Sequence, residues 1–474
     1  MLEFTEYRRF DAVGLADLVR KREVSRAEIL QAAIERLEAV NPRLNAVSTK
    51  DFGRARTRSE NATGPFAGVP FLVKDTNDLQ GTPTTWGSAF YRGAIASRTD
   101  TLNQRYLDAG FVALGKTIAP ELALIGTSEP LAFGAVRNPF DLSRTAGGSS
   151  GGAAAAVVSG IVPAAQGSDG GGSIRCPASA CGAFGLKPTR ARTPSGPVAG
   201  EGWQSLLQQH MLTRSVRDSA AILDISHGPE VGDPYQVAPP SRPFIQEVGA
   251  DPGRLRIAMM THYAEGPAID PECMDNARSA AKLCESLGHY VEETFLPSSI
   301  TVERMFRLLG TVCAVWVRSM LESRAATVGR AVTSQDVEPM TWEIYNAAKD
   351  ISGVTYYQTI QEMHAVCRTV GQFFKNYDAL LTPGLGKVAV PLRFMDTRGS
   401  AASVVQALAE FCPFTTVYNV TGQPAAAVPY GWTEGGLPIG IQLVTRFGDE
   451  ATLLRLCAQI EQAAPWAHRY EAIT

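Results

Sequence analysis

The sequence predicts a large α/β protein with a mixed, mostly parallel central sheet that is covered on both faces by helices. Two observations predict this fold. Short, continuously apolar segments recur along the 474 residues, and longer amphipathic segments separate them. Continuously apolar strands are typical of sheets buried on both faces, whereas a strand with one solvent-exposed face alternates apolar and polar residues. Strands that alternate with helices are the pattern of layered α/β folds.

The chain begins with two amphipathic helices, expected over residues 11–20 and 25–40. A glutamate follows Ser25 by three residues, which is the spacing of a capping box at the start of a helix. Apolar residues then recur on one face of the second helix. The Asn41–Pro42 pair is expected to end that helix, because proline lacks the N–H group that a helix interior needs.

The remaining elements follow from apolar runs and helical periodicity. Buried strands are expected at 68–73, 110–115, 379–383, 425–429 and 439–444. Helices are expected around 100–109, 152–160, 270–287, 360–376 and 449–463. Since no repeat or long low-complexity linker divides the chain, residues 1–474 are expected to form one domain. Residues 295–375 hold several aromatic residues and are expected to form a helical wall over a substrate pocket.

Charge and composition argue against several classes of function. The chain has 44 Lys and Arg against 47 Asp and Glu, a net charge of −3 that provides no basic surface for nucleic acid. It shows no apolar run long enough to span a membrane and no secretory signal. The eight cysteines form no CxxC pair, which favours reduced thiols over disulfides or a zinc site. We therefore expect a cytoplasmic monomer or homodimer with no nucleic-acid or membrane partner.

One motif suggests nucleotide binding, and its composition argues against that function. Residues 110–117, GFVALGKT, satisfy the phosphate-loop pattern GxxxxGK[ST]. A phosphate loop needs small residues between its glycines so that backbone N–H groups can surround an anion. The intervening residues here are Phe, Val, Ala and Leu, which are typical of a buried strand. A nucleotide-binding protein therefore remains only as a disfavoured alternative function.

Glycine is concentrated in one short part of the chain. Nine of the 44 glycines lie between Thr145 and Arg175, where they flank serines in the motifs GGSSGG (147–152) and DGGGSIR (169–175). Glycine permits unusual backbone conformations and a close approach of substrate. Consecutive N–H groups at such a place can form an oxyanion hole, in which each donor contributes about 3–4 kcal/mol to the transition state of acyl transfer. The cluster therefore predicts a serine nucleophile.

A serine nucleophile needs a base. None of the six histidines lies in a glycine-rich or acidic motif, which disfavours a Ser-His-Asp hydrolase. Lysine is the other base that serine uses. Lys74 follows the apolar run 69–73, and burial there would lower its pKa from about 10.4 by roughly 3–5 units. Lys74 is thus the candidate base.

Several motifs together resemble the amidase signature family of serine hydrolases. They are GVPFLVKD, GGSSGG, GSDGGGSIRCPAS, CGAFGLKPT, NVTGQPAAAVP and GLPIGIQLV, and the resemblance runs from about residue 12 to residue 465. It implies a Ser–cis-Ser–Lys triad and no metal or organic cofactor. Ser173 would be the nucleophile, Ser149 the bridging serine after a cis peptide bond with Gly148, and Lys74 the base. All three lie within an expected catalytic core, residues 60–195.

The resemblance also implies supporting roles around the triad. The backbone N–H groups of Ser173 and of the three glycines before it would stabilise the oxyanion. Those glycines are Gly170, Gly171 and Gly172. The family commonly has a larger residue at one of the first two positions, so the extra glycine is expected to loosen the loop or widen the acyl site.

Three further residues are expected to support this arrangement. Ser150 is expected to hydrogen-bond Lys74. Asp169 and Arg175 are expected to hold the shape of the loop rather than to touch substrate.

The implied reaction is hydrolysis of a small-molecule amide through an acyl-Ser173 intermediate, with carbamates or esters as further substrates. The motifs are most similar to those of bacterial members that hydrolyse aminohexanoate oligomers or urethanes. A second interpretation is a glutaminase similar to the A subunit of an aminoacyl-tRNA amidotransferase, which would need a partner for activity. The sequence leaves the identity of the amide or carbamate open.

Overall fold

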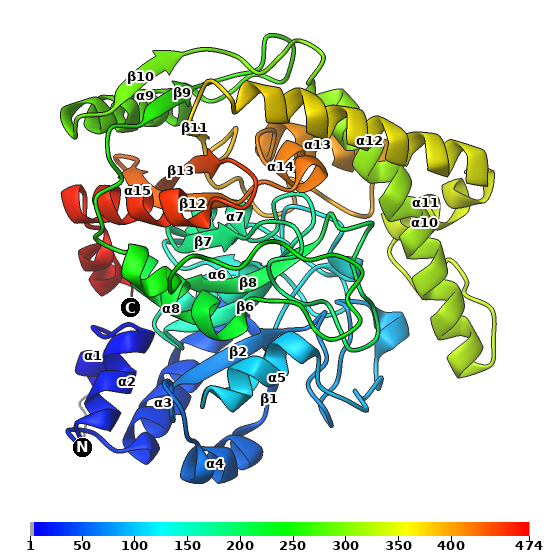
Figure 1. Ribbon diagram of the computed structural model, residues 1–474. Coiled ribbons are helices and arrows are strands. Elements are labelled where there is room, and N and C mark those ends of the chain that lie inside the picture. The colour runs from blue at the N-terminus through cyan, green and yellow to red at the C-terminus, as the bar shows by residue number, and fades with distance from the viewer. Residues whose placement is uncertain (1–3, 474) are drawn as a thin grey trace.

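The computed structural model describes residues 4–473 (Figure 1), and an 11-stranded sheet forms its centre, with helices around it. The strand order is β1-β3-β2-β6-β8-β7-β12-β13-β11-β9-β10. The strands of this sheet are β1 (Val47–Lys50), β2 (Pro70–Lys74), β3 (Val112–Thr117), β6 (Ala164–Asp169), β7 (Phe184–Lys187), β8 (Gln208–Thr213), β9 (Arg256–Met259), β10 (Tyr290–Glu293), β11 (Ala379–Pro383), β12 (Ala425–Trp432) and β13 (Pro438–Thr445). A separate hairpin pairs β4 (Arg137–Asn138) with β5 (Asp141–Thr145).

The helices include every one expected from the sequence, together with others, among them the 27-residue α10. They are α1 (Phe4–Tyr7), α2 (Ala12–Arg20), α3 (Arg26–Leu44), α4 (Phe52–Asn61), α5 (Thr101–Asp108), α6 (Gly151–Val158), α7 (Arg175–Cys181), α8 (Val216–Ser226), α9 (Pro271–Ser286), α10 (Val302–Val328), α11 (Pro339–Ala347), α12 (Gly353–Phe373), α13 (Ala401–Phe411), α14 (Thr416–Thr421) and α15 (Glu450–Ala463). None of these described helices is both long and apolar enough to cross a membrane.

The mixed α/β fold is confirmed, but the expectation of a mostly parallel sheet is wrong. Within residues 4–473, four of the ten neighbouring strand pairs are parallel and six are antiparallel. A continuously apolar strand reports burial on both faces and carries no information about its direction. The short connection between β12 and β13 also requires an antiparallel pair, since parallel neighbours need a long crossover.

The second N-terminal helix, α3, starts at the predicted capping box but ends later than expected. Ser25 makes the reciprocal capping contacts, and the helix then continues through Pro42 to Leu44. Proline in the last turn removes only one helical hydrogen bond. Beyond it, Asn45 takes a left-handed conformation with φ +53° and ends the helix. The side chain of Asn41 meanwhile accepts two backbone N–H groups of the following segment.

The phosphate-loop pattern forms a buried strand, as its apolar residues predicted. Residues Val112–Thr117 are β3, which lies between β1 and β2 in the sheet. The ammonium group of Lys116 is not available for a phosphate. It lies 3.3 Å from a carboxylate oxygen of Asp75 and donates to the carbonyl of Pro83 and the hydroxyl of Thr84.

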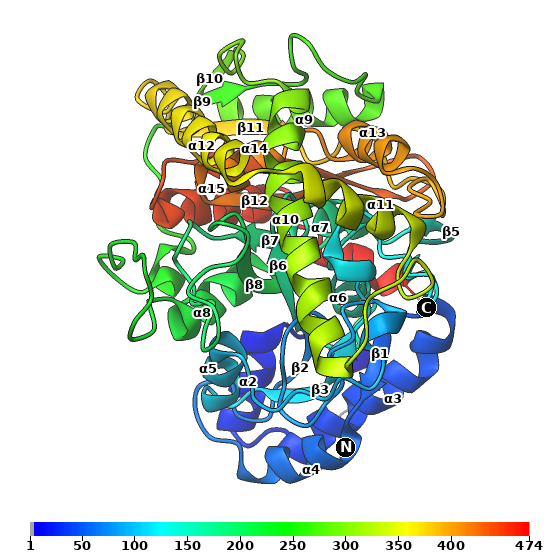
Figure 2. The same ribbon diagram turned by 90° about the vertical axis from the view of Figure 1, so that its right-hand side faces the viewer.

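The site predicted from the glycine motifs lies at the carboxyl ends of two inner strands of the sheet. Strands β2 and β6 are parallel neighbours, so their carboxyl ends, Lys74 and Asp169, lie at the same edge. Figure 2 shows the long helix α10 running along the side of the molecule that carries α11. Helices α10, α11 and α12 occupy the range 295–375, for which a helical wall was expected.

Candidate active site

Lys74 is completely buried at the end of β2 and its amine contacts two serine hydroxyls. The Nζ atom lies 2.7 Å from Ser149 Oγ and 2.9 Å from Ser168 Oγ. Burial lowers the pKa of Lys74 to about 7, while the charge of Asp169 acts in the opposite direction. Loss of solvent disfavours the charged ammonium, so a large fraction of this amine is neutral near pH 7. A neutral amine beside a hydroxyl is able to act as a general base.

Ser149 lies between the base and the cavity that contains the second glycine motif. The peptide bond between Gly148 and Ser149 is cis. Ser128, a buried residue that the sequence did not single out, donates to the carbonyl oxygen of Ser149 at 3.3 Å. The same Ser128 hydroxyl accepts the N–H of Gly151 at 3.0 Å, so it holds the GGSSGG segment at the start of α6.

Ser150 does not take the role expected for it. Its hydroxyl contacts the backbone of Ser168, donating to the carbonyl oxygen and accepting the N–H, each at 3.3 Å. The second hydroxyl on Lys74 is that of Ser168, which lies on β6, the parallel neighbour of β2. The backbone N–H of Ser150 donates to the carbonyl of Ser173 at 3.1 Å. Ser150 therefore joins the two glycine motifs and reaches Lys74 only through Ser168.

Ser173 shares a cavity of about 340 Å³ with Ser149 and Ser168. It is partly exposed, whereas Ser149 is buried. Within residues 4–473 the Ser173 hydroxyl forms no hydrogen bond, and none joins it to Ser149. The structure therefore brings Lys74 and Ser149 into direct contact and places Ser173 beside them at the cavity surface.

The loop that carries Ser173 is held by a buried ion pair between Asp169 and Arg175. Arg175 binds both carboxylate oxygens of Asp169, at 2.8 and 2.9 Å. Its remaining donors reach the carbonyl of Thr415 and the side chains of Asn419 and Gln442. The adjacent guanidinium group lowers the pKa of Asp169 despite complete burial, so the carboxylate stays charged. Both residues lie away from the cavity lining, in agreement with a role in holding the loop.

Some of the backbone N–H groups around Ser173 already form hydrogen bonds within this loop. Gly172 N–H donates to Asp169 at 2.8 Å, which contradicts the expectation that it is free to stabilise an oxyanion. Among the described residues, the N–H groups of Gly170, Gly171 and Ser173 have no hydrogen-bond partner. These three N–H groups remain available as hydrogen-bond donors beside the Ser173 hydroxyl.

The extra glycine of this loop leaves no empty space. A Cβ atom at Gly170 would lie 2.7 Å from the indole of Trp203, which lines the cavity beside Ser173. A Cβ atom at Gly171 would lie 3.0 Å from Leu309 of α10. The expected widening of the acyl site at Gly170 is therefore wrong, because the Trp203 ring occupies the volume that a side chain would fill.

A smaller apolar cavity meets the catalytic one at Ser173. It has a volume of about 40 Å³ and shares Ala123, Ser173 and Trp203 with the larger cavity. Its other walls are mainly apolar and sulfur-containing side chains. They include Leu124, Ile125, Cys176, Phe306, Leu309, Cys313, Leu408 and Cys412. Ser173 thus lies where a large, partly polar space meets a small apolar one.

The larger cavity has an aromatic wall and three carboxylates. Trp316 of α10 lies between Trp86 and Trp203, with ring centroids 5.5 and 5.3 Å from theirs. Asp78, Asp100 and Glu201 also line the cavity. The contribution of α10 includes Met320 as well as Trp316, while the described lining contains no residue of α11 or α12. In the described part of the chain, no three His, Cys, Asp or Glu side chains are placed to hold a metal ion.

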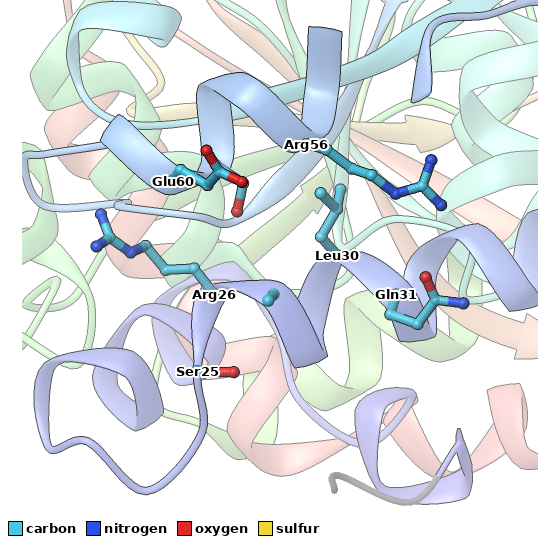
Figure 3. A pocket seen from close by; sticks show the side chains of 8 residues that line it. Ser25, Arg26, Leu30, Gln31, Arg56 and Glu60 are labelled. Atoms are coloured by element: carbon cyan, nitrogen blue, oxygen red, sulfur yellow. The ribbon is translucent and has the colours of Figure 1, made fainter. Parts of the chain in front are cut away.

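A separate groove of about 590 Å³ lies between α3 and α4 (Figure 3). Figure 3 shows the side chains of Arg26, Arg56 and Glu60 around it. It shares no lining residue with the cavity that holds Ser173. Its Ser25 hydroxyl is already used in the capping box of α3. This groove therefore has no part in the arrangement of Lys74 and the serines.

Comparison with known proteins gives a consistent result over almost the whole chain. The profile of the amidase family matches residues 28–454. The chain is 38% identical over 473 residues to 6-aminohexanoate-cyclic-dimer hydrolase of Paenarthrobacter ureafaciens, covering 97% of this chain and 96% of that protein.

Solved structures agree with this result. The structure of 6-aminohexanoate cyclic dimer hydrolase complexed with substrate matches with a TM-score of 0.92 at 37% identity, over 97% of this chain and 98% of that one. A bacterial aryl acylamidase of the amidase signature family matches with a TM-score of 0.89 at 26% identity, over 97% of each chain.

Proposed function

The chain belongs to the amidase signature family, and from that membership we propose that it hydrolyses small non-peptide amides through a relay of Lys74, Ser149 and Ser173. The observation that carries the proposal is the 2.7 Å contact between the buried amine of Lys74 and Ser149, beside the cavity that Ser173 lines. A relatively small cavity of about 340 Å³ and the similarity to a cyclic-dimer hydrolase support a small substrate.

In the first half of the reaction, neutral Lys74 accepts the proton of Ser149 while Ser149 accepts the proton of Ser173. The Ser173 oxygen attacks the amide carbonyl, and the N–H groups of Gly170, Gly171 and Ser173 stabilise the oxyanion. The proton then returns from Lys74 through Ser149 to the leaving nitrogen. The carbon–nitrogen bond breaks, the amine departs, and the acyl group remains on Ser173.

The second half of the reaction uses the same groups with water as the nucleophile. Lys74 and Ser149 accept a proton from water as it attacks the acyl ester. The ester bond then breaks and the proton returns to the Ser173 oxygen, which releases the carboxylic acid. We expect the same relay to accept esters, which differ from amides in the leaving group, and carbamates, whose carbonyl carbon carries both an oxygen and a nitrogen substituent.

The acyl-enzyme provides a direct test. Purified protein is mixed with hexanoyl p-nitroanilide, the corresponding p-nitrophenyl ester and the corresponding carbamate, and the reaction is quenched with acid. We expect release of nitroaniline or nitrophenol, and a hexanoyl adduct on the peptide that contains Ser173 in the ester reaction. Turnover with the adduct on another serine, or no turnover of any of the three substrates, contradicts the proposal.

The pH dependence follows from the pKa of Lys74. Burial lowers this pKa to about 7. Because the reaction needs the neutral amine, kcat/KM for the uncharged anilide is expected to fall as pH decreases through about 7 and to level off above about 8. A rate profile from about pH 5.5 to 9 measures this limb.

Asp100 is the control for this assignment, because burial raises its pKa to about 6 and it lines the same cavity. In Asp100→Asn the fall of kcat/KM near pH 7 is expected to remain, since it reports the protonation of Lys74. A limb that disappears in Asp100→Asn, or a flat profile in the unmodified protein, contradicts the role of Lys74 as base.

A further inference from the structure

We infer that the catalytic cavity selects amides that carry a protonated amine and rejects amides that carry a carboxylate. The inference rests on the proposed function, because Ser173 is what assigns this cavity to the substrate. It is carried by the charges and the aromatic side chains of the cavity wall, which come from separate parts of the chain.

Three carboxylates and no lysine or arginine line the cavity in the described part of the chain. Asp78 and Asp100 lie in the segment between β2 and α5, and Glu201 lies in the segment between β7 and β8. Lys74 lies beneath the surface with its amine bound to two hydroxyls. The lining is therefore negative, and walls of low polarity concentrate such a potential inside a cavity.

None of the three carboxylates has a cationic partner among residues 4–473. Asp100 accepts the backbone N–H of Asp78 at 2.9 Å and the side-chain amide of Asn77 at 3.1 Å, which are both neutral donors. Glu201 accepts only the hydroxyl of Ser205, and the carboxylate of Asp78 accepts no hydrogen bond. Lys116 influences Asp78 and Asp100 from a distance, but its ammonium is paired with Asp75.

The carboxylate of Asp100 is ionised at a pH at which the amine of Lys74 is neutral. Burial raises the pKa of Asp100 to about 6, below the value of about 7 for Lys74. At about pH 8, above both values, Lys74 is mainly neutral and Asp100 is mainly ionised. The cavity is negative under the same conditions in which the relay works.

The aromatic wall provides the second requirement for an ammonium ligand. Trp86, Trp203 and Trp316 form a continuous surface of three indoles, each from a different segment. Indole faces attract cations and also cover alkyl chains. A short alkyl chain that leads from the scissile amide to an ammonium group fits such a surface. A carboxylate at the same place would meet three carboxylates, with no lysine or arginine among the described lining residues to offset the repulsion.

Two matched substrate series test the inference. The first varies the acyl side of a p-nitroanilide: 6-aminohexanoyl, hexanoyl and 5-carboxypentanoyl. The second varies the amine side of hexanoyl amides: the free end of a six-carbon amine carries an ammonium, a methyl or a carboxylate group. In at least one series we expect kcat/KM at pH 8 to be at least about 100-fold higher for the ammonium than for the carboxylate substrate, with a smaller ratio at high salt.

Variants identify the groups responsible for that ratio. In the double variant Asp78→Asn/Glu201→Gln we expect the ratio to fall at least about 10-fold. Glu60→Gln removes a carboxylate from the separate groove between α3 and α4, so the ratio is expected to stay at the unmodified value. Thermal unfolding checks the fold of each variant. If the double variant does not fold, Asp78→Asn alone takes its place, because that side chain makes no hydrogen bond in the described structure.

A ratio near one in both series, or an unchanged ratio in the variant, overturns the inference. These outcomes are separate from a failure of the proposed function. If hexanoyl p-nitroanilide is hydrolysed and hexanoyl ester acylates Ser173 while the ratio is near one, only the substrate class is wrong. If no substrate is hydrolysed and Ser173 is not acylated, the proposed function itself fails.

Discussion

Ser173→Ala is expected to lower kcat/KM for an activated anilide by at least about 10⁴-fold, because it removes the atom that we propose forms the acyl bond. The loss should fall mainly on kcat, since the cavity and the oxyanion donors remain. Because Ser173 is partly exposed and its hydroxyl makes no hydrogen bond within residues 4–473, the fold should not change. Initial rates and a thermal unfolding curve measure both effects.

A matched control is Ser59→Ala. Ser59 is a buried serine of α4 whose hydroxyl also lacks a partner, and it lies outside the catalytic cavity. Its rate should stay near that of the unmodified protein. If Ser173→Ala retains more than a few per cent of the rate, Ser173 is not the nucleophile.

Lys74→Met is expected to lower kcat/KM by about 10⁴-fold with little change in stability, because it removes the proposed base but leaves no buried charge unpaired. The chain offers an unusually close comparison in Lys116. Both lysines are fully buried near the carboxyl ends of the parallel neighbours β2 and β3. Lys74 contacts serine hydroxyls, whereas Lys116 pairs with the carboxylate of Asp75.

Lys74→Met should therefore lower the rate and keep the stability, whereas the main effect of Lys116→Met should be on the stability. Lys116→Met leaves Asp75 buried without its partner, which is expected to lower the free energy of unfolding by about 3–5 kcal/mol. Urea denaturation and initial rates are measured for both variants. If Lys74→Met is destabilised as strongly as Lys116→Met, or keeps its rate after correction for the folded fraction, Lys74 has a structural role and not the role of a base.

Much of this site is predictable from the sequence because its chemistry needs unusual residue patterns. Lys74 follows an apolar run, and such a run predicts a buried strand end and a lowered pKa. Ser149 and Ser173 each lie among glycines, which marks backbone that a substrate approaches closely. These are local signals, so a single sequence carries them.

The features that the sequence did not predict depend on which strands become neighbours. Ser168 contacts Lys74 only because β6 lies parallel to β2. Trp203 fills the space at Gly170 from a loop in which three consecutive residues have left-handed φ values, at 51°, 53° and 59°. None of these three residues is a glycine, although residues with side chains rarely adopt such a conformation. The directions of the strands were missed for the same reason. The path of α3 through Pro42 was missed because a proline in the last turn of a helix removes only one hydrogen bond.

The ion pair that shapes the Ser173 loop joins an early part of the chain to a late one. Asp169 and Arg175 lie in the first half of the chain, but their partners Thr415, Asn419 and Gln442 lie near its end. A nascent chain that has emerged only as far as residue 400 contains Lys74, Ser149 and Ser173, yet its Arg175 lacks these acceptors. Since domains begin to fold while the chain is still being made, the catalytic loop is completed only after the last part emerges. Chains that end before residue 415 therefore lack all three of these acceptors for Arg175.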